Sequence, residues 1–113
     1  MQRGEIYLAK FPFGDVPGMK LRPVLLLTES VGPIPEILVA YISSVIPAQV
    51  LPSDVVMDST RAEFASTHLK IISALRLHKL ATLHVSSLAR QLGRIEAPQQ
   101  TVIDSKLKAL LGL

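Results

Sequence analysis

The residues whose types and spacing could do chemistry include an arginine and a histidine two positions apart, Arg76 and His78. They lie in a segment rich in leucine, and on a β-strand residues two apart point to the same face. Leu75 and Leu77 would then turn toward the core, and a permanent cation would stand beside a side chain that titrates near neutral pH. Such a pair could perform acid–base chemistry on a phosphodiester. The alternative is a solvated sheet face.

Two further places combine a suitable side chain with a strand end. Arg22 stands where a glycine-bearing loop meets the apolar run that follows Pro23. A guanidinium there could bind a phosphate in its fixed fork, or it could be a solvated charge at the entrance to a strand. Ser43 and Ser44 end another apolar strand. Their hydroxyls could contact a phosphate oxygen, or they could serve turn formation.

The sequence lacks the patterns of other common sites. His68, His78 and His84 show no metal-ligand spacing, there is no cysteine, and neither a glycine-rich phosphate loop nor a nucleophile elbow occurs. We therefore expect no metal and no cofactor.

The elements that would position these residues are mostly short strands separated by proline and glycine. We expect strands over 5–11, 24–28, 36–43, 54–57, 69–77 and 80–83, loops at 12–18 and 32–35, and single helical turns within 59–65 and 86–91. The apolar run at 24–28 suggests burial on both faces. Many short strands with frequent turns favour a small β-barrel over a βαβ fold.

The end of the chain has a helical pattern instead. Pro98 suits a first helical turn, Gly112 suits a stop, and apolar residues between them fall on one face. These are Val102, Ile103, Leu107, Leu110 and Leu111. We expect one domain over 1–113, with a barrel at 1–96 and a helix at 97–112 packed on it.

Composition narrows the function. The chain has 113 residues, a formal net charge of +3 and 49% hydrophobic residues, with a mean hydropathy of +0.40. The high apolar fraction indicates either a dense core or, as we favour, an apolar surface covered by a second subunit. The mild basic bias is compatible with a nucleic-acid partner. No signal peptide or membrane-spanning stretch is found, since the longest uncharged segment, 37–53, is broken by prolines and polar residues. We expect a cytoplasmic protein that does not contact membranes.

Short motifs in a fixed order resemble those of the MazF/PemK toxin family. They are RGEIYL at 3–8, FPF at 11–13, KLRPVLLL at 20–27, AYISS at 40–44, PSDVV at 52–56, SALRLHKLATL at 73–83 and LGRI at 92–95. The resemblance covers essentially the whole chain. It implies a small SH3-like barrel, a homodimer, metal-independent cleavage of single-stranded RNA, and a cognate antitoxin that occupies the RNA groove.

The resemblance also implies roles for the candidate residues. Arg22 matches the arginine of the family's Arg-Pro block, and Ser43 stands where many members have threonine. Arg76 and His78 fall on an acid–base pair in which some members carry an acidic residue at the second position. Ala81 stands where many members have arginine. We expect catalysis by these four residues: Arg22, Ser43, Arg76 and His78. We expect substrate contacts from Lys20, Ser44, Lys79 and Thr82.

Two other functions stay open at this point. A CcdB-like protein on the related toxin fold would poison DNA gyrase without needing these side chains. An interaction module could have kept the barrel and lost the chemistry. The basic bias at Lys20, Arg22, Arg76 and Lys79 predicts an acidic, partly disordered antitoxin.

Overall fold

The computed structural model describes residues 1–11 and 20–113, which form strands, two short 3-10 helices and one α-helix. In chain order they are β1 (Glu5–Phe11), β2 (Lys20–Leu26), β3 (Glu36–Ser43), β4 (Asp54–Met57), η1 (Ala62–Thr67), β5 (Ser73–His84), η2 (Val85–Ser87), β6 (Leu88–Arg94) and α1 (Ala97–Leu111). The loop expected at 12–18 lies outside the described residues. The loop expected at 32–35 joins β2 to β3.

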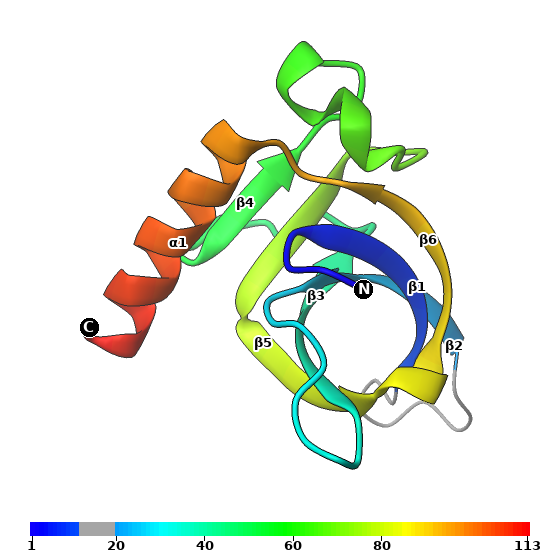
Figure 1. Ribbon diagram of the computed structural model, residues 1–113. Helices are drawn as coiled ribbons and strands as arrows, with labels where there is room; N and C mark the ends of the chain where they lie inside the picture. Colours follow the sequence, from blue (N-terminus) through cyan, green and yellow to red (C-terminus); the bar gives the residue numbers. More distant parts are fainter. Residues whose placement is uncertain (12–19) are drawn as a thin grey trace.

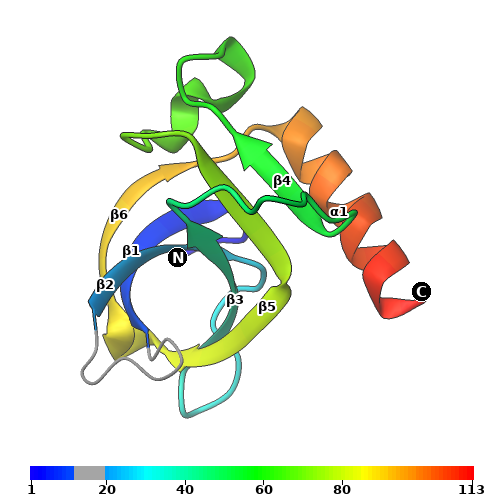
Figure 2. The same ribbon diagram turned by 180° about the vertical axis from the view of Figure 1, so that it is seen from behind.

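The strands form a single antiparallel sheet in the order β4-β5-β3-β2-β1-β6. The sheet curls on itself into a barrel-like shape, with α1 beside β4 (Figures 1 and 2). Within the described residues the edge strands β4 and β6 do not pair with each other, so the barrel is open. The expected fold class, mainly β with a C-terminal helix, is confirmed.

Apolar side chains fill two clusters, one on each face of the sheet. Along the run after Pro23, Val24 and Leu26 belong to one cluster, and Leu25 and Leu27 belong to the other. The alternation follows the two-residue period of a strand. The expectation that this run is buried on both faces is therefore confirmed.

The strand that carries this run begins earlier than expected, because β2 starts at Lys20 and contains Pro23 in its interior. Pro23 pairs with Leu8 of β1, whereas pairing with β3 begins only at Val24. Proline is tolerated there because this part of β2 has a partner strand on one side only, so its missing N–H interrupts no second ladder.

Two expectations for the later strands are wrong. The separate strands expected at 69–77 and 80–83 are one strand, β5, which starts at Ser73 and runs through a bulge. The helical turn expected at 86–91 is confined to η2, and the residues after it form β6. Both errors come from pairing between distant segments, since β3 and β1 supply the partners that local sequence does not reveal.

The C-terminal helix begins and ends as expected. Pro98 lies in the first turn of α1, and Gly112 ends it in the left-handed conformation at φ 73°. Arg3, near the other end of the chain, pairs with Asp104 of α1. The hydrogen bonds from Arg3 hold the pKa of Asp104 below its ordinary value. No helix in the described part of the chain is long and apolar enough to cross a membrane.

The apolar face of α1 is only partly buried. Ile103 is fully buried, and Leu107 packs against the same core cluster, the one that contains Leu25. Val102, Leu110 and Leu111 of the expected face are exposed instead. The helix therefore presents apolar surface that this chain does not cover.

Candidate active site

A bulge in β5 places His78 and Lys79. Ala40 of β3 pairs with Leu80, whereas the next residue, Tyr41, pairs with Arg76. The residues 77–79 therefore have no partner in β3, and the backbone N–H of Leu77 bonds instead to the carbonyl of Ser53, 3.0 Å away. Bulges of this kind redirect side chains and are frequent beside active sites.

Arg76 is fixed by a buried carboxylate on the neighbouring strand. Asp54 is its register partner in β4, and Arg76 Nε donates to Asp54 Oδ1 at 2.6 Å. The Asp54 side chain is completely buried, and its other oxygen accepts from the backbone N–H of Leu51 at 2.8 Å. A buried charge needs such partners. The guanidinium of Arg76 is therefore held in one orientation.

His78 contacts Arg76, as the two-residue spacing predicts. Arg76 Nη2 lies 3.4 Å from His78 Nε2, and His78 Nδ1 lies 3.0 Å from the Ser53 hydroxyl. Because a guanidinium only donates, a hydrogen bond between these two groups requires Nε2 as the acceptor, which places the ring proton on Nδ1. The contact with Arg76 is long for a hydrogen bond, so a substrate hydroxyl could replace it at Nε2. Leu75 and Leu77 are fully buried, as expected.

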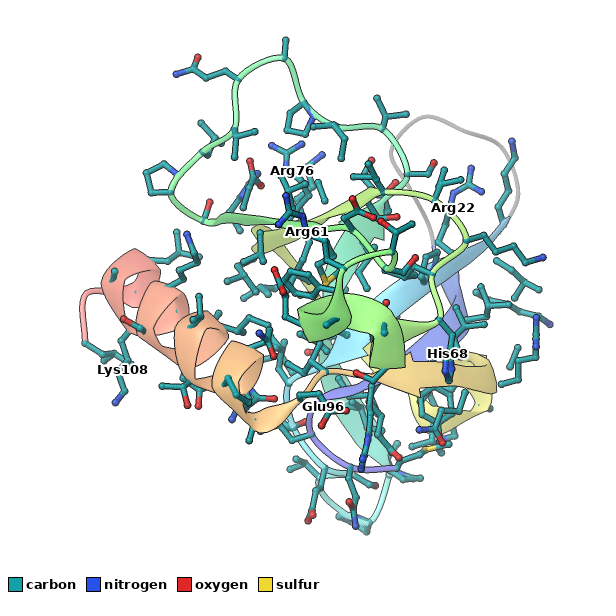
Figure 3. All side chains as sticks on the ribbon, turned by 90° about the horizontal axis from the view of Figure 1, so that it is seen from above. Arg22, Arg61, His68, Arg76, Glu96 and Lys108 are labelled. Atoms are coloured by element: carbon teal, nitrogen blue, oxygen red, sulfur yellow. The ribbon has the colours of Figure 1, made fainter. Side chains whose placement is uncertain are left out.

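Arg22 and Ser43 lie on the same face of the sheet as this cluster. Val24 of β2 pairs with Tyr41 of β3, and Tyr41 pairs with Arg76. Arg22 and Ser43 are each two residues from that row, so the strand period points them to the same side. Arg22 is half-buried. Figure 3 shows Arg22 and Arg76 in the upper half of the view.

The hydroxyl of Ser43 is engaged in a local turn. It donates to the carbonyl of Val45 at 3.0 Å and accepts from the N–H of the same residue at 3.1 Å. This is the turn chemistry that the sequence left open as the alternative. A phosphate contact would require the O–H to leave the Val45 carbonyl.

The expected substrate-contacting residues are spread more widely. The Lys79 ammonium lies 5.8 Å from the centre of the Tyr41 ring. Tyr41 is the register partner of Arg76 in the sheet. Lys20 and Ser44 are exposed at strand ends. Thr82 lies beyond the bulge, opposite Leu38, in a depression that it shares with Thr28 and Glu36. The structure thus brings Lys79 to the Arg76 cluster and leaves Thr82 apart from it.

Two residues of this cluster had no role assigned from the sequence. The sequence predicts only that Asp54 begins a short strand and that Ser53 and Asp54 belong to a family-like segment. The carboxylate of Asp54 at the start of an apolar strand could have indicated a buried ion pair. Its partner, however, depends on the register of β4 on β5. Among residues 1–11 and 20–113, no group of three or more His, Cys, Asp or Glu side chains is arranged to hold a metal ion.

A small curled antiparallel sheet that carries the Arg76–His78 pair and is followed by a C-terminal helix is the architecture that the resemblance to a toxin family implies. A family model confirms this resemblance: residues 2–111 match the PemK-like, MazF-like toxins of type II toxin–antitoxin systems. The chain belongs to this family, and the expectation from its motifs is confirmed.

Solved structures agree with this assignment. The Mycobacterium tuberculosis toxin MazF-mt6 is 25% identical with a TM-score of 0.74, covering 96% of this chain and 97% of that one. An endoribonuclease from a Mycobacterial species, in complex with its cognate antitoxin, is 16% identical with a TM-score of 0.71, covering 100% and 96%. MazF from Deinococcus radiodurans is 20% identical with a TM-score of 0.69, covering 100% and 97%. The last two show likeness of fold alone. No curated protein sequence matches the chain.

Proposed function

We propose that this toxin is a metal-independent endoribonuclease that cleaves single-stranded RNA. The observation that carries the proposal is the contact of His78 with Arg76, whose guanidinium is fixed by buried Asp54. Arg22 projects from the same face of the sheet. The chain also belongs to the PemK-like, MazF-like toxin family, and two solved proteins of the same fold are described as endoribonucleases.

In the proposed reaction, the ribose 2′-oxygen attacks the adjacent phosphorus. His78 Nε2 takes the proton of the 2′-hydroxyl, replacing its contact with Arg76. Arg76 Nη2 and Arg22 donate to the phosphate oxygens and stabilise the charge of the phosphorane. The bond to the 5′ oxygen then breaks, and that oxygen takes a proton from His78 or water. The products are a 2′,3′-cyclic phosphate and a 5′-hydroxyl.

The remaining expected residues would guide the RNA. Lys20 and Lys79 would hold phosphates that flank the cleavage site. Ser44 and Thr82 would contact the RNA farther from the cleavage site, and Ser43 would orient a phosphate oxygen. Since the nucleophile is the 2′-hydroxyl, DNA would not be cut. A toxin that cuts cellular RNA would act in the cytoplasm.

The test is incubation of the purified protein with single-stranded RNA in EDTA. We expect cleavage with cyclic-phosphate ends, and no cleavage of a DNA strand of the same sequence. A protein that leaves RNA intact in EDTA and inhibits DNA gyrase would instead be a CcdB-like poison. One that does neither would be an interaction module.

We also propose that the toxin is a homodimer. Apolar side chains are exposed on the loop after β3, where Val45 is 73% exposed, and at the end of α1, where Leu111 is 58% exposed. A hollow of about 510 Å³ lies between Pro52 and Leu110, beside the end of α1. A second copy would remove this surface from water. Sedimentation at micromolar concentration should give about twice the chain mass of 12.3 kDa, and a monomer there would contradict it.

An acidic antitoxin is the expected partner. The cations proposed to bind RNA would attract a peptide that mimics its charge, and structures of MazF-type relatives with antitoxins exist. Affinity for this partner should fall as salt rises. Recovery from the native host of no small acidic protein bound to the toxin would contradict this proposal.

A further inference from the structure

A cationic depression lies on the opposite face of the strand ends that carry Arg22 and Ser43. Its volume is about 260 Å³, and Pro23 and Ser44, the residues that follow those two, line it. Neighbouring strand residues point to opposite faces. The depression, which we call the β6 pocket, is therefore separated from the proposed active site only by the thickness of the sheet edge.

The β6 pocket combines apolar walls with a basic rim. Leu69 and Leu92 line it together with Pro23, and the rim carries His68, Lys70 and Arg90. None of the described residues that line it is acidic. Lys70 and Arg90 form no salt bridge within the described part of the chain. A concave surface with apolar walls and unneutralised cations suits a ligand that is both flat and anionic.

The rim is held in place by the packing of η1 on β6. Gly93 makes this possible, because a Cβ there would lie 2.3 Å from the carbonyl oxygen of Ser66. Ser66 Oγ donates to the carbonyl of Arg94 at 2.9 Å. His68 Nδ1 donates to the carbonyl of Leu92, also at 2.9 Å. The imidazole is therefore oriented, and its Nε2 stays available to accept a hydrogen bond.

The backbone at His68 is strained in a way that also indicates a built site. It has a φ of 53°, the only non-glycine residue among those described with a positive φ. Side chains other than glycine adopt this conformation at a cost, and such outliers concentrate at functional sites. Here the conformation ends η1 and turns the chain into the segment that carries Lys70.

We propose that the β6 pocket binds one nucleotide of the RNA beside the scissile phosphate, an inference that rests on the proposed nuclease function. The base would lie between Pro23 and the two leucines, with Lys70 and Arg90 on its phosphates and His68 Nε2 accepting from the base. The RNA strand would pass over the edge of the β-sheet at Ser44 to reach Arg22. A single nucleotide suits the size of the pocket, and the shared edge with the active site favours RNA over an acidic peptide.

The test measures binding of a single-stranded 2′-fluoro RNA, which lacks the nucleophile, by fluorescence anisotropy over a series of salt concentrations. The variants are Lys70→Ala, Arg90→Ala and their combination, with Lys108→Ala as the matched control. Lys108 is an exposed cation on α1, at the far edge of the molecule from His68 (Figure 3). A second readout follows the methyl NMR signals of Leu69 and Leu92 when RNA is added.

The double variant should bind roughly tenfold more weakly at low salt, and the slope of log affinity against log salt should fall by about 1.4, or about 0.7 for each lost phosphate contact. The Lys108→Ala variant should match wild type, and RNA should shift both leucine signals. Equal affinity and slope in the double variant would overturn the proposal. So would leucine signals that respond to an acidic peptide and not to RNA. Because 2′-fluoro RNA reports binding alone, failure of the nuclease proposal would appear separately, as intact ordinary RNA.

Discussion

The two arginines assigned to catalysis lie in opposite electrostatic settings. Arg76 donates to Asp54, whose carboxylate is completely buried, and the Arg76 side chain is only 16% exposed. Arg22 is half-buried and forms no salt bridge with the described residues. Arg76 is part of an ion pair that is built into the sheet, whereas Arg22 has no ionic partner among residues 1–11 and 20–113.

This difference assigns different roles to the two arginines, one in positioning groups and one in stabilising charge. A paired guanidinium contributes directed donors at a fixed position but little net charge, so Arg76 suits the orientation of His78 and of a phosphate oxygen. An unpaired guanidinium attracts the substrate and stabilises added charge in the transition state. Loss of Arg76 should therefore affect folding and activity, whereas loss of Arg22 should affect activity alone.

The largest effect is expected for Arg76→Ala. It leaves the Asp54 carboxylate buried without its ionic partner, which typically costs about 3–5 kcal/mol in the free energy of unfolding. Urea denaturation checks this value. In the double variant Arg76→Ala/Asp54→Asn the buried charge is gone, and much of the stability should return. A double variant as unstable as Arg76→Ala would show that the pair is not what holds this part of the sheet.

Arg22→Ala should leave the urea midpoint nearly unchanged and lower kcat by about 100- to 1000-fold, as loss of one transition-state donor does. Arg22→Lys should restore little, because an ammonium cannot reproduce the planar fork. Lys108→Ala, which removes a cation from α1, is the control for a general loss of charge. Equal activity of Arg22→Ala and Lys108→Ala would remove Arg22 from the site.

Ser43 distinguishes a chemical role from a structural one. Ser43→Ala removes both hydrogen bonds to Val45 and should cost about 1 kcal/mol of stability. Ser43→Thr keeps the hydroxyl and should be nearly silent in both stability and rate. If Ser43→Ala lowers kcat by no more than its loss of folded protein explains, the hydroxyl serves the turn and not the phosphate.

The smallest effect concerns the ion pair between Arg3 and Asp104 of α1. Asp104 has a lowered pKa because Arg3 donates to it, so the folded state favours its ionised form. That stabilisation is present above the ordinary value of 3.8 and is lost as pH falls through the lowered pKa. Both side chains are more than a third exposed, so Asp104→Asn should cost about 0.5 kcal/mol at neutral pH. The difference from wild type, followed by urea denaturation, should shrink as the solution is made acidic.

The sequence was sufficient where the signal is local. Pro98 and Gly112 bound the helix, the apolar run around Val24 predicted burial on both faces, and the two-residue spacing brought Arg76 beside His78. It was insufficient where distant segments pair. Asp54 meets Arg76 only through the register of β4 on β5, and nothing near Leu88 indicates that β1 will pair with β6.

The central claim is that His78 transfers the proton in RNA cleavage, and the most direct measurement is the pH–rate profile of His78→Gln in EDTA. Histidine is the side chain that ordinarily titrates between about pH 5 and 8. The variant should lose roughly 100-fold in rate, and its profile should be flat over that range. His84→Gln, on the same strand but beyond the bulge, is the matched control and should retain the wild-type profile. A His78→Gln rate and profile equal to those of wild type would contradict the account and assign the proton transfer to another group.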